Sequence, residues 1–446
     1  MKEFPFDLRR NIEKMSLFSV RGTSKKESEL PRWFAGVNIS GDCRRIESSM
    51  IGVHGQGGGA PIEVRKAMSF DLPQEITSCY NELQESVSEG FRHSSETKGG
   101  IDSALLFHLM RELASVEEEA FEELLNESRL SCGDVLALGI HDPGIRRSTS
   151  HGIFYQSLCD APFLAEQTGM NIIDSFPLSD IVSRGCGGPV FALPTWIFLK
   201  SEEQDRLLLD LGRTARTTFL PQAINSFSSQ RIDCHDIVPC GSLLDVLTWE
   251  LTQGKQTVDL GGKLTVQGCQ IPELLAELHS LAKSPVAWNP FGLSPEPFIA
   301  ATLCKTASGY SYQDVLCTAC NFIAEAIAEK ILDRLAETGV EAEILLTGSA
   351  RQHGMLLNLI STALHQRPMV PITRYGFPSE TFDSLCAALL TFMCVDRIPS
   401  SLPHVTGAET TRSLGRLTFG STTNWQRLLQ SILRTKPTVR TLRSAM

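Results

Sequence analysis

At 446 residues the chain is long enough for two to three domains, and its 42% hydrophobic and 21% charged residues are typical of a folded globular protein. A formal net charge of −10 would repel a polyanion, which argues against nucleic-acid binding as the main function. The longest apolar runs fall short of the about 20 residues that cross a bilayer, so no membrane partner is expected.

Residues 1–31 are predicted to form a polar N-terminal extension, because they lack the continuous apolar core of a signal peptide. The expected location is therefore the cytoplasm, where the 13 cysteines would be reduced thiols. Cys317 and Cys320 form a CxxC, but they lie in a helical pattern and no second pair accompanies them. The spacing favours an ordinary helix over a zinc site.

The first half of the chain begins with alternating apolar stretches at 32–39, 50–53 and 62–64, which predict a meander of three strands. Between the last two, HGQGGGAP at 54–61 matches no phosphate-binding motif and predicts a flexible hairpin turn. The elements expected next are helices at 74–91, 103–125 and 158–168, and strands at 135–140 and 171–174.

The pattern then restarts, with a strand at 206–211 and a hairpin partner at 217–220. Helices are expected at 243–253, 272–282, 314–338 and 381–394, and a strand at 343–346. This repetition predicts two α/β lobes, at 32–204 and 205–425, with an interlobe cleft in which ligands would bind. Residues 426–446 are expected to be the end of a C-terminal helix and a basic tail.

Three predicted strand ends carry small residues: Ser40-Gly41-Asp42, Asp210-Leu211-Gly212 and Thr347-Gly348-Ser349-Ala350. Each alone could be an ordinary turn. Together they provide three places, on two lobes, where a phosphate can approach the backbone closely. This layout is similar to that of the sugar kinase and actin superfamily, in which two hairpins hold the phosphates and a third turn holds the adenosine. The expected fold is a two-lobed actin-like ATPase (ribonuclease H-like) fold with mixed sheets.

Within that superfamily, the chain resembles the anhydro-N-acetylmuramic acid kinases over most of residues 32–425. The resemblance rests on the order and spacing of several segments. These are Gly139 to His141, DAPFLAEQTG at 160–169, Phe176 with the segment 180–189, DIVPCGSLLD at 236–245, the Gly348 turn and LPHVTGA at 402–408. The resemblance implies binding of ATP with Mg²⁺. It also implies a reaction in which a water, activated by an aspartate, opens 1,6-anhydro-N-acetylmuramic acid while the sugar is phosphorylated at its 6-position.

The resemblance further implies a set of site residues. Nucleotide contacts are expected from Ser40, Gly41, Asp42, Gly212, Gly348 and Ser349. Sugar contacts are expected from His141, Asp160 and Asp180, and a magnesium contact from Asp236. For three of these a structural role is equally open: His141 as a packed residue, and Asp160 and Asp236 as helix N-caps.

This sequence departs from the family pattern where the chemistry is expected. The base of the family lies in an Asp-Phe-Arg triplet, which is Ser175, Phe176 and Pro177 here. Asp174 lies one residue earlier, which on a strand is the opposite face unless a bulge intervenes. Asp174 and Ser175 are therefore the candidate catalytic positions. In the first turn, Asp42 replaces a small hydroxyl residue and would repel phosphate unless a magnesium ion lies between them.

Three readings of the function stay open. One is a working kinase that uses Asp174, and another is a pseudokinase that keeps the cleft for ligand binding or regulation. The third is a scaffold, for which a homodimer is possible. Arg184, Arg213 and Arg216 could supply positive charge at the cleft or be ordinary surface residues. In the first two readings the partners are a nucleotide and an anhydro amino sugar.

Overall fold

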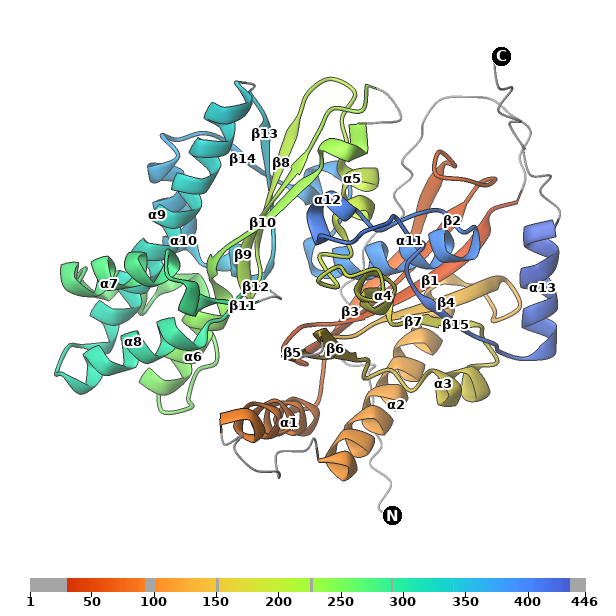
Figure 1. Ribbon diagram of the computed structural model, residues 1–446, viewed down its shortest axis with the longest axis horizontal. Coiled ribbons are helices and arrows are strands. Elements are labelled where there is room, and N and C mark those ends of the chain that lie inside the picture. The colour runs from red at the N-terminus through yellow and green to blue at the C-terminus, as the bar shows by residue number, and fades with distance from the viewer. Residues whose placement is uncertain are drawn as a thin grey trace.

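The computed structural model describes residues 30–92, 102–149, 152–224, 228–289, 292–339 and 341–433. The chain forms two lobes, each built on one large mixed sheet (Figure 1). Nearly all of the predicted N-terminal extension, and the basic tail from residue 434, lie outside the described residues.

The first sheet begins with an antiparallel meander, whose strands are β1 (Arg32–Ile39), β2 (Arg45–Val53) and β3 (Ile62–Asp71). The segment 54–61 is the turn between β2 and β3, as predicted. Two parallel strands follow: β4 (Val135–His141) pairs with β1, and β7 (Ile172–Asp174) pairs with β4. A sixth strand, β15 (Arg416–Thr418), pairs antiparallel with β7, so that the order is β15-β7-β4-β1-β2-β3.

The second sheet repeats this plan. Its meander is β8 (Arg206–Leu211), β9 (Thr214–Leu220) and β10 (Asp233–Pro239), and its parallel strands are β13 (Glu343–Thr347) and β14 (Met369–Pro371). The order is β10-β9-β8-β13-β14. The predicted two-lobed, actin-like α/β fold with mixed sheets is confirmed, although the sequence patterns missed β10, β14 and β15.

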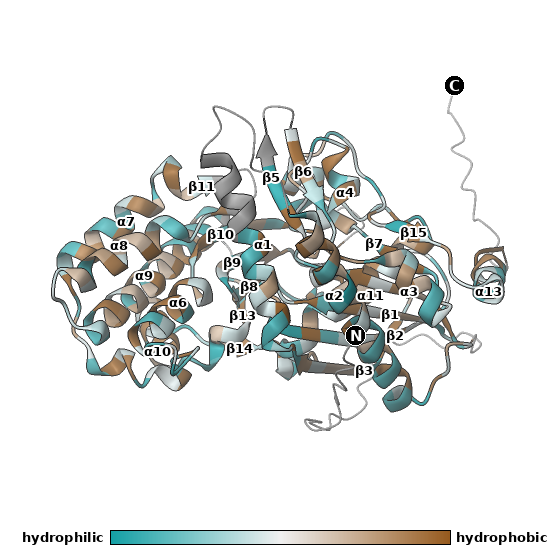
Figure 2. Cartoon of the chain, turned by 90° about the horizontal axis from the view of Figure 1, so that it is seen from below, coloured by the Kyte–Doolittle hydropathy of each residue, from teal (hydrophilic) through white to brown (hydrophobic). Residues whose placement is uncertain are grey.

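Helices cover the outer face of each sheet. The first lobe uses α1 (Gln74–Arg92), α2 (Ser103–Ser128) and α3 (Ala161–Thr168). The second lobe uses α6 (Gly241–Leu251), α7 (Pro272–Ala282), α8 (Glu296–Ala307), α9 (Tyr312–Thr338) and α10 (Gly354–Ala363). Figure 2 shows hydrophobic and hydrophilic positions alternating along α7, α8 and α9, as expected for helices with one buried face.

Small elements complete the chain. They are the hairpin β5 (Ile145–Thr149) and β6 (Gly152–Gln156), the short pair β11 (Trp288–Asn289) and β12 (Gly292–Leu293), and the helices α4 (Phe176–Ile181), α5 (Ala192–Leu199), α11 (Phe382–Val395), α12 (Pro403–Thr406) and α13 (Thr422–Leu433). Cys317 and Cys320 are both buried on α9, and Cys320 belongs to the core of the second lobe.

Helix α11 lies between the two sheets and is buried on almost every side. One apolar core joins its Leu385 and Leu389 to residues of both sheets, such as Phe34 of β1 and Leu208 of β8. The sequence-based division had assigned residues up to 425 to the second lobe. The structure instead returns the chain to the first sheet at α11, because this apolar helix packs on β1, β2 and β4 and because β15 pairs with β7.

The close packing of α11 on β1 depends on a glycine. A Cβ built at Gly36 would lie 2.3 Å from the backbone nitrogen of Ala388 and from the carbonyl oxygen of Ser384. Backbone atoms of a buried helix cannot move aside cheaply. We therefore expect Gly36→Ala to lower the free energy of unfolding by about 3 kcal/mol, measured by urea denaturation. Gly59→Ala, with nothing within 4 Å of the new Cβ, is the control and should change little.

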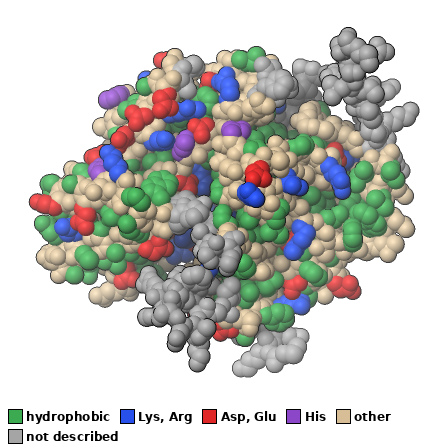
Figure 3. Space-filling view, viewed as in Figure 1, with side chains coloured by type: hydrophobic (Ala, Val, Ile, Leu, Met, Phe, Trp, Pro, Cys, Tyr) green, Lys and Arg blue, Asp and Glu red, His purple; other side chains and the backbone are tan. Residues whose placement is uncertain are grey.

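The visible surface carries hydrophobic side chains as well as charged ones. On the face shown in Figure 3, acidic and basic side chains are interspersed rather than gathered by sign. Among the described residues, no helix combines the length and apolar character needed to span a bilayer.

Candidate functional site

A cleft of about 1990 Å³ lies between the lobes. Its walls come from the ends of β1 and β4 and the start of α11 on one side, and from β8, β10, α6 and the turn after β13 on the other. The predicted site residues that line it are Ser40, Gly41, Asp42, His141, Gly212, Asp236, Gly348 and Ser349. Those that do not line it are Asp160, Asp174, Ser175 and Asp180.

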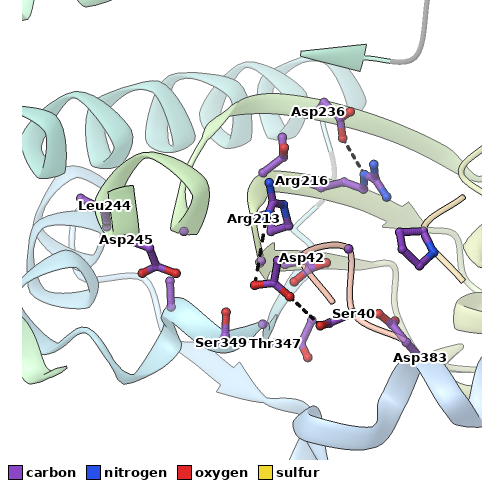
Figure 4. A pocket seen from close by; sticks show the side chains of 18 of the residues that line it. Ser40, Asp42, Arg213, Arg216, Asp236, Leu244, Asp245, Thr347, Ser349 and Asp383 are labelled. Carbon is purple, nitrogen blue, oxygen red and sulfur yellow. Dashed lines mark hydrogen bonds and ion pairs between the residues drawn. The ribbon is translucent and has the colours of Figure 1, made fainter. Parts of the chain in front are cut away.

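The turn between β1 and β2 directs the Asp42 carboxylate back toward Ser40 (Figure 4). Asp42 Oδ1 accepts hydrogen bonds from the Ser40 hydroxyl at 2.6 Å and from the backbone N–H of Arg44 at 3.2 Å. The Ser40 hydroxyl oxygen in turn accepts from the N–H groups of Arg44 and Arg45, at 3.2 and 3.0 Å. Donors that could face a phosphate are thus partly engaged by a carboxylate of the protein itself.

Two ion pairs cross the cleft at this turn. The Arg213 side chain, from the turn between β8 and β9, lies against Gly41, and its Nη1 is 4.0 Å from Asp42 Oδ2. In the opposite direction, Arg44 Nη1 of the first lobe is 3.5 Å from Asp245 Oδ2 on α6. Burial raises the pKa of Asp245 to about 6, and the charge of Arg44 opposes that rise. Two ion pairs therefore link the lobes where phosphates are expected. In one the arginine belongs to the second lobe, and in the other it belongs to the first.

On the second-lobe side, backbone segments approach one another very closely. Gly348 has φ +93°, and a Cβ there would lie 2.3 Å from the carbonyl carbon of Leu211. A Cβ at Gly241, at the start of α6, would lie 3.0 Å from the carbonyl oxygen of Gly212. The turn after β8, the start of α6 and the turn after β13 therefore meet at one corner of the cleft, as the resemblance implied for nucleotide contacts.

Arg216 of β9 interacts with carboxylates from both lobes, and Figure 4 shows Asp236 beside it. The Nε of Arg216 donates to Asp236 Oδ1 at 2.6 Å. Burial, and then the charge of Asp383, raises the pKa of Asp210 to about 7. Burial also raises the pKa of Asp383, which Arg216 opposes. Asp236 lies within strand β10 and not at a helix start, so the N-cap interpretation of this residue is wrong.

These carboxylates bear on the expected magnesium ion. A divalent cation between Asp210 and Asp383 would relieve the repulsion that contributes to the raised pKa of Asp210. Magnesium in kinases is commonly held by one or two carboxylates together with substrate phosphates. The described residues include no group of three or more metal-binding side chains, so the phosphates would have to complete such a site. Asp210 and Asp383 fit this role better than Asp236, whose charge Arg216 already neutralises.

His141, at the end of β4, lies on the first-lobe wall of the cleft. Its Nδ1 is 2.8 Å from Asn38 Oδ1, and its ring packs 4.6 Å from the ring of Phe191. Burial, and then the charge of Arg146, lowers the pKa of His141 to about 3. The ring is therefore neutral at physiological pH. With Nδ1 donating to Asn38, Nε2 keeps a lone pair that can accept a hydrogen bond.

The lowered pKa of His141 predicts a pH dependence of stability. In the unfolded chain the imidazole takes up a proton below pH 6.5, whereas in the folded protein it does so only near pH 3. The folded state is therefore most stable, as far as His141 is concerned, above pH 6.5. It loses stability relative to the unfolded chain as the pH falls from 6.5 toward about 3. Thermal midpoints measured from about pH 7 to about pH 4 should therefore fall more steeply for the wild type than for His141→Gln. Parallel curves would contradict the burial of a neutral ring.

Asp174, at the end of β7, is fully buried and held by β15. Arg416 binds it with two hydrogen bonds, Nη2 to Oδ2 at 2.5 Å and Nε to Oδ1 at 3.1 Å. The Ser175 hydroxyl also donates to Asp174, at 2.9 Å. Ser175 is itself buried and has φ +54° at the start of α4. Ser175 thus bonds to Asp174, Asp174 bonds to Arg416, and neither candidate catalytic residue lines the cleft.

Asp180 and Asp160, both predicted to contact sugar, bond to neighbouring groups of the protein and do not line the cleft. Asp180 accepts from the Gly187 N–H at 2.9 Å and from the Thr406 hydroxyl at 2.7 Å, which joins the glycine segment to LPHVTGA. Asp160 caps α3 by accepting from the Phe163 N–H at 3.2 Å. The N-cap interpretation of Asp160 therefore agrees with the structure.

The structure distinguishes the three arginines whose position, at the cleft or on the surface, the sequence did not decide. Arg213 and Arg216 line the cleft, whereas Arg184 pairs with Glu409 at the surface. Sequence reasoning missed Asp245 and Asp383 as cleft residues. Asp245 is the last residue of the DIVPCGSLLD segment, and Asp383 lies in the first turn of the apolar helix α11. An acidic residue at the end of an apolar element could have indicated both of them.

Comparison with known proteins identifies the family. The family model described as anhydro-N-acetylmuramic acid kinase matches residues 81–420, which is more than half of the chain. The chain belongs to the anhydro-N-acetylmuramic acid kinase family. The match begins after the β1–β2 turn, so Ser40, Gly41 and Asp42 lie outside the matched span.

Individual relatives agree with this assignment. The chain is 29% identical over 317 residues to the anhydro-N-acetylmuramic acid kinase of Bordetella pertussis, covering 68% of this chain and 78% of the relative. It is 28% identical over 307 residues to that of Burkholderia thailandensis, covering 66% and 77%.

Two solved structures overlap the chain more loosely. One is the activator of the 2-hydroxyisocaproyl-CoA dehydratase from Clostridium difficile with bound ADPNP, at 12% identity and a TM-score of 0.36, covering 81% of this chain and 94% of that one. The other is the (R)-2-hydroxyglutaryl-CoA dehydratase component A of Acidaminococcus fermentans, at 11% identity and a TM-score of 0.36, covering 81% and 98%. The family assignment rests on the family match and not on these overlaps.

Proposed function

We propose that the protein binds a nucleoside triphosphate with Mg²⁺ in the interlobe cleft and uses it to phosphorylate an anhydro amino sugar, the reaction of its family. The observation that carries this proposal is the convergence of three backbone turns and the side chains of Arg213 and Arg216 on one cleft. Arginine guanidinium groups and close backbone N–H groups are the usual partners of transferring phosphates.

In this proposal the second lobe holds the nucleotide at Gly212, Gly348 and Ser349, and Asp210 with Asp383 holds the magnesium ion. Bound there, the ion would neutralise charge on the phosphates during transfer. His141 accepts a hydrogen bond from a hydroxyl group of the sugar at Nε2, because its ring is neutral and lines the cleft. The sugar is 1,6-anhydro-N-acetylmuramic acid, and the relatives are named anhydro-N-acetylmuramic acid kinases. A cytoplasmic location and a homodimer belong to the same proposal.

A second function, nucleotide binding without turnover, is favoured by one observation. The base that opens the anhydro bridge would have to be Asp174, and Arg416 holds this carboxylate away from the cleft. To act on a water in the cleft, Asp174 would have to leave Arg416. Otherwise the cleft serves as a ligand-binding or regulatory site.

Calorimetric titration of the purified chain with Mg-ATP, with and without the anhydro sugar, tests both functions, followed by a product assay on the same sample. Sugar 6-phosphate formation would establish the kinase. Nucleotide binding without product would establish the second function. Absence of binding of either ligand at about millimolar concentration, well above ordinary KM values, would reject both.

A further inference from the structure

A third cysteine lies beside the CxxC of α9. It is Cys269, in the segment that joins the 3₁₀ turn Thr265–Gln267 to α7. Cys269 is exposed, whereas Cys317 is 6% exposed and Cys320 is 0% exposed. The sequence pattern singled out only the last two, because Cys269 is far from them along the chain. The three thiols therefore combine one that reagents in solution can reach with two that are buried.

The segment that carries Cys269 runs against the beginning of α9. A Cβ built at Gly268 would collide with the backbone of Gln313, so the two backbones are in direct contact. At the next residue, the N–H of Cys269 donates to Asp314 Oδ1 at 2.6 Å. Asp314 is itself held in place, because the Ser311 hydroxyl donates to its other oxygen at 2.6 Å. The backbone at Cys269 is therefore fixed against the first turn of α9.

Cys317 lies on α9 between two residues that bond to this segment. The first is Asp314, which binds Cys269, and the second is Thr318, whose hydroxyl accepts from the N–H of Ile271 at 2.9 Å. Residues three and four apart on a helix share a face, so Cys317 is on the side that the segment covers. Burial, and then the charge of a Cys269 thiolate, raises the pKa of the Cys317 thiol. Such an effect of one thiol on another requires them to be close.

Cys317 and Cys320 are poorly placed to form a disulfide with each other. Both lie in the interior of α9, where side chains three residues apart have Cβ atoms about 5–6 Å apart. A disulfide needs Cβ atoms about 3.5–4.5 Å apart. Cys320 also belongs to the core of the second lobe, where a dissolved oxidant does not reach it. The partner of Cys317 is therefore expected from outside the CxxC.

We propose that Cys269 and Cys317 are a redox-active pair that forms a reversible disulfide by exchange with small disulfides such as glutathione disulfide. The Cys269 thiolate attacks one sulfur of glutathione disulfide, which forms a mixed disulfide and releases one glutathione thiolate. The Cys317 thiolate then attacks the Cys269 sulfur and releases the second glutathione. The two protein thiols are oxidised, glutathione disulfide is reduced, and the protons lost by the cysteines pass through solvent to the two glutathione thiolates.

This disulfide would join the segment before α7 covalently to α9 and would close a loop of roughly 50 residues. The stretch 257–260, only a few residues before Cys269, lines the interlobe cleft. Oxidation would therefore restrain the second lobe beside the cleft. In a compartment that glutathione keeps reducing, the pair stays as two thiols, and it closes when the proportion of glutathione disulfide rises.

The test incubates the full chain with glutathione disulfide and maps the products by mass spectrometry of the intact protein and of its peptides. The wild type should lose two thiols and give one cross-linked peptide that contains Cys269 and Cys317. Cys269→Ser should give no such cross-link. Cys317→Ser should stop at a glutathione adduct on Cys269, because the second thiol is missing. The thermal midpoint of the oxidised wild type should be at least about 3 °C above that of the reduced form, and dithiothreitol should reverse the rise.

Cys132→Ser is the matched control, because Cys132 is also exposed but lies in the first lobe, just before β4. This variant and Cys320→Ala should both form the cross-link as the wild type does. Folding of Cys269→Ser is not at risk, since the side chain is exposed. A cross-link between Cys317 and Cys320, a wild type that stops at the glutathione adduct, or thiols that do not react at all would each overturn the inference.

Discussion

Replacing Arg416 with alanine should lower the free energy of unfolding by about 3 kcal/mol at neutral pH. The reason is that Asp174 is fully buried and receives two hydrogen bonds from this guanidinium. Without Arg416, the carboxylate keeps only the Ser175 hydroxyl and lies near two further buried acids, Glu117 and Asp142, whose pKa values burial already raises. The Arg416 side chain is 55% exposed, which places the effect at the low end for a buried pair.

Urea denaturation with a double-mutant cycle measures this effect. Asp174→Asn combined with Arg416→Ala should recover most of the stability, because no buried charge then lacks a partner. Arg184→Ala is the matched control, since Arg184 pairs with Glu409 at an exposed site and its loss should cost less than about 1 kcal/mol. A loss of that small size in Arg416→Ala would mean that water or neighbouring groups compensate Asp174.

The same variants bear on catalysis. Asp174→Asn should leave the affinity for ATP unchanged, because Asp174 does not line the cleft. If the variant folds normally and binds ATP but forms no sugar phosphate, Asp174 must leave Arg416 during the reaction. If sugar phosphate still forms, another group activates the water.

Replacing Asp42 with asparagine should raise the affinity for inorganic tripolyphosphate and for ADP by about tenfold at low ionic strength. In the wild type the Asp42 carboxylate accepts from Ser40 and from the Arg44 N–H and faces Arg213, so it competes with a phosphate for these partners. Asparagine keeps an oxygen that can accept both hydrogen bonds but carries no charge. The turn should therefore keep its shape while the repulsion disappears.

Calorimetric titration at two salt concentrations checks this result, since the gain should shrink as salt screens the charges. Asp71→Asn is the control, because Asp71 also lines the cleft at the first sheet but is 83% exposed, with only a 3.6 Å contact to Arg45. It should change affinity by less than about twofold. A weaker affinity in Asp42→Asn would mean that the carboxylate assists binding, for example through the magnesium ion.

Local sequence patterns were enough to predict most of the secondary structure. Strand β1 has the predicted bounds, and α1, α7 and α9 differ from prediction by at most a few residues at their ends. These elements have clear periodicity over eight or more residues. The short strands β14 and β15 were missed because three residues carry no period, and their pairing depends on strands far away in the chain.

For the candidate site, too, some residues could be predicted from local sequence and others could not. Positions at turns were predicted well, since glycine and small polar residues mark turns through backbone geometry alone, and Gly212 and Gly348 do line the cleft. Polar side chains at the end of an apolar segment could not be assigned to the cleft or to the core. Asp174 is an example, because its partner Arg416 lies 242 residues away.

The sequence by itself determined the family, the two-lobed plan and the three turns of small residues that line the cleft, because local periodicity, turn residues and segment order are properties of the chain alone. Only the tertiary structure decided that α11 and β15 belong to the first sheet, that Asp174 is bound by Arg416, and that Asp42 and Arg44 pair with Arg213 and Asp245 across the cleft. The physical reason is common to all three. Each depends on groups that are far apart in the chain and that meet only in the folded protein, so neither their burial nor their charge pairing exists before folding.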